Sequence, residues 1–228
     1  MSTATGYQHV IRNSLRQWLV AAALYTGLFW FFMWYHAVRG RPYSLFVANK
    51  CAGIAAVFLI GLALALGPAA RRWKRWRIGL PHRRSLGLFG AYASIPHALV
   101  SLFGSGILAF PKEGQFNWAW HVAHWPCGLF GAATLVTLAT IVSQSYPGGL
   151  NRLGHERWLR LQKLNWLLPG LILGHLVFKG TFANWIKWLQ TLDKPFPPGA
   201  MTTAVFVVAV LILKLTELGL APTRKDLA

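Results

Sequence analysis

The chain has 228 residues, and its composition is that of a membrane protein. Hydrophobic residues make up 55% of it, charged residues only 12%, and twelve residues are tryptophan, which is too apolar for a soluble domain of this length. The formal net charge of +18 is also found in nucleic-acid-binding proteins, but here the basic residues gather in short segments between long apolar stretches. That distribution indicates a membrane topology and argues against a nucleic-acid partner.

Six stretches of the chain are long and apolar enough to cross a bilayer, which takes about 20 mostly apolar residues in a helix. In chain order they are residues 18–36, 44–66, 86–109, 121–143, 164–186 and 201–221. We therefore predict an all-α integral membrane bundle of six helices. Residues 1–228 are expected to form a single domain, because the loops and the tail after Leu220 are too short for a separate soluble fold.

Neither the first apolar stretch nor the two cysteines indicate a cleaved, disulfide-bonded protein. The first stretch is longer than the apolar part of a signal peptide, about 7 to 15 residues, and it ends in MWYHAVRGRPY without a small-residue cleavage site. We expect it to stay in the mature protein. Cys51 and Cys127 lie within predicted helices without CxxC spacing, so they are expected to serve packing.

Basic residues mark one side of the predicted bundle. Seven Lys or Arg lie in RRWKRWRIGLPHRR, between the second and third stretches, four in NRLGHERWLRLQK, between the fourth and fifth, and four in the two tails. The opposite loops carry about five. The positive-inside rule then places both termini and the two basic loops in the cytoplasm. The basic loops would also attract anionic lipid headgroups, with docking of a phosphate-bearing cofactor as the alternative.

Two histidines, His97 and His175, fall deep inside predicted spans. The third helix is expected to leave the cytoplasmic face near Ser85 and the fifth near Lys163, so at 1.5 Å per residue each histidine lies roughly 18 Å along its helix. They would therefore sit at equal depth on two parallel helices. An imidazole in hydrocarbon is costly unless it is bonded to something, so this pair marks a candidate site.

Small residues line the face of the third helix that carries His97, at Gly90, Ala93, Ser94, Ser101 and Gly104. Such a stripe leaves room for a flat ligand, and beside two histidines it favours a planar macrocycle whose iron is bound from both faces. The alternatives are close packing between helices and histidines that are hydrogen-bonded for structural reasons.

Three stretches carry a family resemblance in their order and spacing: NKCAGIAAVFLIGLALALGP in the second helix, RRSLGLFGAYASIPH entering the third, and RWLRLQKLNWLLPGLILGH entering the fifth. With the six-helix count, they resemble the ferric reductase-like transmembrane domain superfamily over most of the chain. That superfamily includes the membrane part of NADPH oxidases and the haem-binding membrane subunit of the bacterial methionine sulfoxide reductase system. The resemblance implies a b-type haem bound by His97 and His175, electron transfer across the membrane, and a location in the bacterial inner membrane.

One position departs from the family pattern and bears on the number of haems. Many relatives read W..LH.L at the start of the fifth helix, where the histidine belongs to or neighbours a second, cytoplasmic-side haem site, but this chain has Gln162 there. No histidine lies between Ser85 and Tyr92 to complete such a site. We therefore expect one haem, with two as the alternative. Some relatives carry a flavin on the cytoplasmic side, and the basic, Trp-rich loop leaves that cofactor open.

The outer side carries its own histidines. The segment WAWHVAHW at the mouth of the fourth helix places His121 and His124 three residues apart, so they share a helix face and could bind a metal or a second haem. The alternative is an aromatic belt at the membrane interface, where histidine is well tolerated. His36 lies on the same side, and its role stays open.

Two lysines lie inside predicted spans at a similar level. Lys179 is one turn beyond His175 towards the outer face, and Lys50 is in the second helix. Haem propionates are anions that need a partner at that depth, so we assign Lys179 to cofactor binding. Either lysine could instead extend its ammonium to the interface.

Two classes of function follow. In the first, the chain carries electrons through haem from a cytoplasmic flavin, a reductase or membrane quinol to an acceptor on the outer side, with a redox partner protein and membrane lipid as its partners. In the second, it is a cofactor-free membrane subunit or small transporter with structural histidines. Because the sequence holds no nucleotide-binding motif, we do not expect NADPH oxidation by this chain alone.

Overall fold

The computed structural model describes residues 3–107, 125–145 and 153–220, and within these ranges the chain is helical without strands. The elements are α1 (Thr3–Val38), α2 (Leu45–Arg72), η1 (Lys74–His82), α3 (Arg83–Ile107), α5 (Trp125–Ser145), α7 (His155–Gln162), η2 (Lys163–Trp166), α8 (Leu167–Leu176), η3 (Val177–Thr181), α9 (Phe182–Thr191) and α10 (Gly199–Leu220). Within the described ranges, the all-α prediction is confirmed.

Five of these helices are long and apolar enough to cross a membrane, and a sixth crossing results if one bent pair counts as a span. The bent pair is His155–Lys179 followed by Phe182–Thr191, with an angle of 74° between its parts. The predicted stretch 164–186 is thus not one straight helix: it starts earlier, at His155, and turns after Lys179. The protein is an integral membrane protein with five or six candidate membrane spans.

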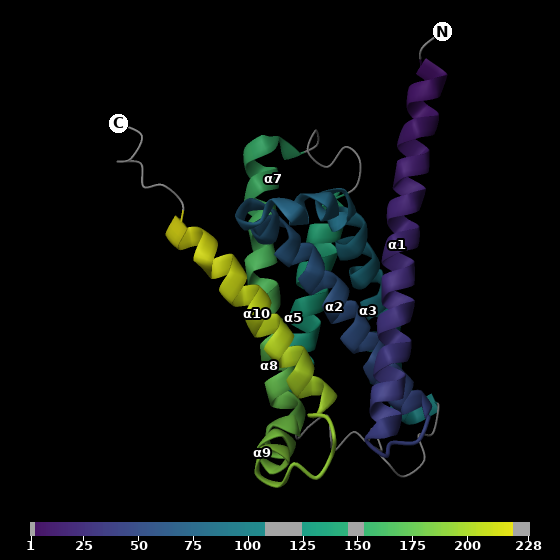
Figure 1. Cartoon of the computed structure of the whole chain (residues 1–228), viewed down its shortest axis with the longest axis vertical. Coiled ribbons are helices and arrows are strands. Elements are labelled where there is room, and N and C mark those ends of the chain that lie inside the picture. Colours follow the sequence, from purple (N-terminus) through teal and green to yellow (C-terminus); the bar gives the residue numbers. More distant parts are fainter. Residues whose placement is uncertain (1–2, 108–124, 146–152, 221–228) are drawn as a thin grey trace.

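The described ends of the helices are grouped at two opposite ends of the bundle (Figure 1). The start of α1 and the end of α10 lie at the same end of the bundle as η1 and α7, whereas α9 lies at the opposite end (Figure 1). The basic segments that the sequence places on one side therefore lie together. The assignment of that side to the cytoplasm stays a prediction from the charge distribution.

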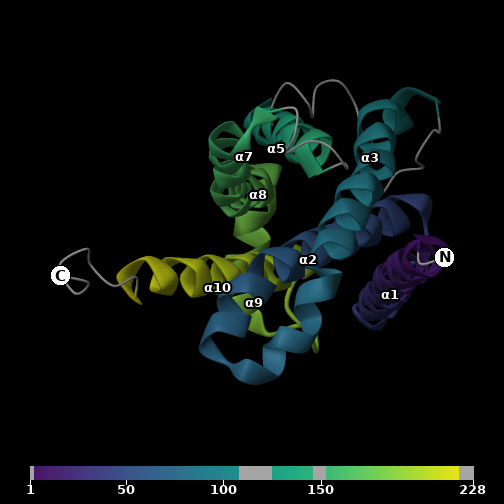
Figure 2. The ribbon, with the colours of Figure 1, turned by 90° about the horizontal axis from the view of Figure 1, so that it is seen from above.

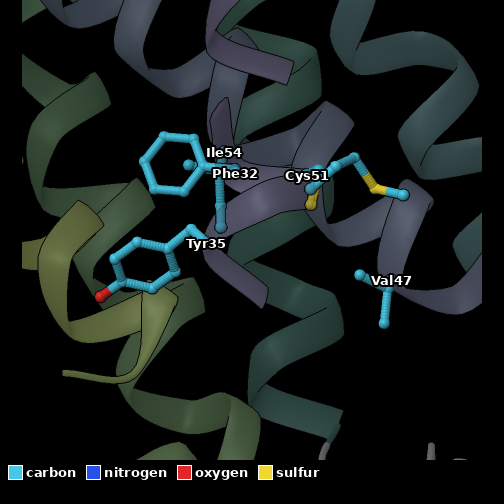
Figure 3. Close-up of a cluster of buried hydrophobic side chains, with 6 residues drawn as sticks. Phe32, Tyr35, Val47, Cys51 and Ile54 are labelled. Carbon is cyan, nitrogen blue, oxygen red and sulfur yellow. The ribbon is translucent and has the colours of Figure 1, made fainter. Parts of the chain in front are cut away.

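Helix α2 is the centre of the bundle. It packs against α1, α3 and α10, and α1 and the group of α5, α7 and α8 lie on opposite sides of it when the bundle is viewed from above (Figure 2). One core cluster joins Phe32 and Tyr35 of α1 to Val47, Cys51 and Ile54 of α2 (Figure 3). Cys51 is fully buried there, as expected for a packing residue.

The second half of the bundle is built on the contact between α5 and α8, and it meets the first half where α3 contacts α5 and where α10 contacts α8. Pro169 in α8 has no N–H to donate to the Asn165 carbonyl four residues earlier. The ammonium of Lys214 in α10 donates to that carbonyl instead, at 3.1 Å, and lies 4.5 Å from the centre of the Trp166 ring. This bond explains why a lysine is buried in α10.

Candidate functional site

His97 of α3 is held by a single residue of α2. Its Nδ1 atom lies 2.8 Å from the backbone oxygen of Asn49 and 3.1 Å from the side-chain oxygen of the same residue. A carbonyl oxygen can only accept, so Nδ1 carries the proton and Nε2 keeps its lone pair. Gly53, one turn after Asn49, makes room for the ring: a Cβ there would lie 2.8 Å from His97 Cε1.

His175 of α8 is held in the same manner by α5. Its Nδ1 lies 3.0 Å from the backbone oxygen of Cys127 and 3.4 Å from the Cys127 sulfur. The proton is again on Nδ1, and the lone pair is on Nε2. Gly131, one turn after Cys127, makes room for this ring, since a Cβ there would lie 3.1 Å from His175 Nδ1.

The two half-sites repeat one construction. In each, a helix offers the carbonyl of one residue and a glycine four positions later, and a histidine 48 residues after the carbonyl donates to it. The α2–α3 and α5–α8 pairs therefore form two hairpins of similar build that run in the same direction (Figure 1), each with one half-buried imidazole.

The two histidines belong to different hairpins, His97 to α2–α3 and His175 to α5–α8. His97 lies within electrostatic reach of His175, and both lie within reach of the Lys179 ammonium. Among the described residues, none is hydrogen-bonded to Nε2 of either ring. The arrangement thus leaves one nitrogen lone pair in each half of the bundle without a hydrogen bond from a described residue.

Lys179 follows His175 by one turn, inside a π-helical turn. Segment η3 is π-helical, and the Thr181 hydroxyl donates to the Leu176 carbonyl at 3.0 Å, so the wider turn is closed by a side chain. Isolated π turns are frequent at functional sites. Within the part of the chain that the structure describes, Lys179 has no hydrogen bond or ion pair, which is costly for a partly buried ammonium.

His36 lies within electrostatic reach of both Lys50 and Lys179. Its ring is 8% exposed, and its Nε2 has no partner among the described residues. Lys50 lies 3.8 Å above the centre of the Phe46 ring. The surroundings of the His36 ring are therefore cationic, as a binding place for an anionic group would be.

The two imidazoles suit a metal that is already coordinated by a cofactor and needs few ligands from the protein. Within the described ranges, no group of three or more His, Cys, Asp or Glu side chains could hold a metal ion. Two imidazoles alone do not complete the coordination of a bare transition metal, whereas an iron porphyrin needs only its two axial ligands from the protein. The residues present fit a haem. His121 and His124 lie outside the described residues, so no outer metal cluster is tested.

Several positions that the sequence analysis singled out serve packing. A Cβ at Gly90 would lie 2.8 Å from Ile60 and 2.9 Å from the Ala56 carbonyl, so this glycine allows α3 to approach α2 closely. Ser101 accepts a hydrogen bond from the Asn49 side chain. The stripe of small residues on the His97 face thus serves helix contact at these two positions.

The residues that sequence reasoning missed are those opposite the histidines. Asn49, Gly53 and Gly131 were not expected to take part, and Cys127 was expected only to pack. A signal was present in the sequence, since a polar or sulfur-bearing residue followed by glycine four positions later occurs 48 residues before each deep histidine. The repeat becomes meaningful only once the helix pairs are known.

No family model matches the chain. Over 125 residues it is 31% identical to the protein-methionine-sulfoxide reductase heme-binding subunit MsrQ of Deinococcus radiodurans, a region that covers 54% of this chain and 58% of that protein. The chain thus spans somewhat more than half the length of this relative. The resemblance that the three motifs predicted is confirmed as a sequence relationship, and the chain is a relative of a haem-binding membrane subunit.

Proposed function

We propose that this protein is a b-type haem membrane protein that carries electrons across the bilayer, with His97 and His175 as the two axial ligands of one haem. The observation that carries the proposal is the state of the two imidazoles. Each donates its Nδ1 proton to a backbone carbonyl, which is the usual outer contact of a metal-ligating histidine and leaves Nε2 for the metal.

The surroundings of the pair support a haem rather than a structural histidine pair. Structural histidines would be expected to bond to each other or to a polar side chain through both ring nitrogens, but the Nε2 atoms have no such partner in the described residues. The bound haem would supply reversible one-electron chemistry. The protein supplies the ligands, holds the tautomers and excludes water from the ligand bonds.

Lys179 is proposed to bind a haem propionate from the outer side of the pair. Its field reaches both His97 and His175, and an anion there would give the ammonium the partner that the described residues do not provide. The charge of Lys179 also acts on His36. His121 and His124 are assigned to the aromatic belt, so one haem per chain is expected.

The wider setting is proposed from the relative and from the charge distribution. We place the single domain 1–228 in the bacterial inner membrane with both termini in the cytoplasm. Electrons would enter from a cytoplasmic flavin or reductase, or from quinol in the membrane, and leave to an acceptor on the outer side. The relative is named as a subunit, which supports a redox partner protein for this chain as well.

The test is the haem content of the full chain purified in detergent. A Soret band with a low-spin, six-coordinate spectrum is expected, and pyridine haemochrome quantification should give one haem per polypeptide. Folded protein without a Soret band, even after haem supplementation during expression, would instead support the cofactor-free membrane subunit or transporter.

A further inference from the structure

The two half-sites differ in what lies beside the carbonyl that each histidine contacts. At His97 the second contact is the side-chain oxygen of Asn49, at 3.1 Å, whereas at His175 it is the sulfur of Cys127, at 3.4 Å. A thiol sulfur is a weak acceptor, and an amide oxygen is a good one. His97 therefore has two strong acceptors at Nδ1, and His175 has one.

The orientation of the Asn49 amide is determined by its neighbours. Its Nδ2 atom donates to the hydroxyl of Ser101 at 3.0 Å, and its oxygen faces a ring nitrogen that must carry a proton, because that nitrogen also contacts a backbone carbonyl. Turning the amide over would place an NH₂ group against an N–H group. Asn49 thus bridges α2 and α3, with Ser101 holding the amide in the productive orientation.

We infer that Asn49 is a positioning residue that makes His97 the more electron-donating of the two haem ligands and thereby lowers the reduction potential of the haem. The inference rests on the proposed ligation by His97 and His175. An acceptor at Nδ1–H pulls the proton away from the ring and raises the basicity of Nε2. A more basic ligand favours ferric over ferrous iron, and hydrogen bonding of this kind is one of the levers that set haem potentials.

The structure also explains why the side chain can be changed without losing the site. The shorter of the two contacts at His97 Nδ1 comes from the Asn49 backbone, which every substitution retains. Asn49→Ala should therefore keep both ligands and the Nδ1 tautomer while it removes only the second acceptor. Cys127→Ala is the matched control, since it removes the weak acceptor from the equivalent position of the other hairpin.

The experiment is a redox titration of the haem-loaded full chain, followed by optical spectroscopy, with electron paramagnetic resonance of the oxidised form. Asn49→Ala should raise the midpoint potential and shift the low-spin g-values, and Cys127→Ala, which removes only a weak acceptor, should shift both by less. Asn49→Asp, which retains the shape and adds a negative charge next to Nδ1–H, should lower the potential.

The outcomes separate this inference from the proposed function. Wild-type protein without a low-spin haem would overturn the ligation itself. Low-spin haem in wild type and Asn49→Ala with the same potential, or an equal shift in Cys127→Ala, would overturn only the role of Asn49. If Asn49→Ala does not fold, the comparison of Asn49→Asp with wild type decides, and an unchanged or raised potential contradicts the inference.

Discussion

The α2–α3 hairpin and the α5–α8 hairpin hold their histidines through the same backbone contact but lie in different surroundings. Most of α2 is buried between α1, α3 and α10, whereas little of α5 is buried. His97 has an amide network at Nδ1, and His175 has a thiol. The shared part is a carbonyl that accepts from Nδ1 and a glycine that leaves space for the ring. The parts that differ are the side chains beside that carbonyl.

The two hairpins also differ in the residue one turn after the histidine, which is neutral in one and charged in the other. The position one turn after the histidine is Ser101 in the first hairpin and Lys179 in the second. Ser101 holds the Asn49 amide, whereas Lys179 puts a positive charge near both rings. One hairpin therefore contributes a hydrogen-bond network, and the other contributes the cation proposed to bind a propionate.

The most severe test of the comparison removes one ligand at a time. His97→Ala and His175→Ala should each abolish low-spin haem binding, because each leaves the iron with one protein ligand. The measurement is the Soret and α-band spectrum together with haem per folded chain. Retention of the wild-type low-spin spectrum in both variants would contradict the assignment of the pair.

A smaller loss of haem binding is expected when a methyl group is added at the glycine that leaves space for each histidine ring. Gly53→Ala would place a methyl carbon 2.8 to 2.9 Å from three atoms of the His97 ring, and Gly131→Ala would place one 3.1 Å from His175 Nδ1. Disturbing an outer contact of a metal ligand commonly costs roughly 10- to 100-fold in metal affinity. We expect haem affinity to fall in both variants, and further in Gly53→Ala.

The control for the glycine variants lies on α5 itself. A Cβ at Gly128 would meet no atom within 4 Å, so Gly128→Ala should keep wild-type haem affinity. Haem dissociation rates, measured by transfer to an excess of an apo-haemoprotein, would rank the variants. Equal haem dissociation rates for Gly53→Ala and Gly128→Ala would show that the space beside Gly53 is not needed for haem ligation by His97.

Removal of the Lys179 charge should have a milder effect on haem binding than Gly53→Ala, which fills the space that the His97 ring occupies. A hydrogen bond to a charged group contributes about 1.5–3 kcal/mol. At the lower end of that range, Lys179→Gln should weaken haem binding by roughly tenfold while the spectrum stays low-spin. Lys187→Gln, at an exposed position of α9, is the charge-matched control. If both variants bind haem equally well, Lys179 does not contact a propionate.

The smallest effect on haem content is expected for His121 and His124, which do not belong to the two hairpins. Replacing His121 and His124 together should leave haem per chain unchanged, because both are assigned to the aromatic belt. Iron and haem are to be measured on wild type and double variant, matched for folded protein. A fall from two irons to one would overturn the single-haem expectation and would place a second iron at the outer side.

Much of the fold followed from the sequence because the hydrophobic effect acts on length and composition. The apolar stretches predicted helices across a bilayer, and the basic segments predicted which ends lie together, as Figure 1 shows for η1 and α7. The bend after Lys179 was not predicted, because residues 164–186 are mostly apolar and a π turn leaves no mark on composition.

By itself, the sequence determined the membrane class and the likeness to a haem-binding subunit. Only the tertiary structure decided which atoms meet each ring, because the carbonyls of Asn49 and Cys127 are 48 residues away in the chain and a backbone oxygen is the same in every residue. The roles of Gly53 and Gly131 depend on that pairing too, since a missing side chain matters only where another group comes to occupy its space.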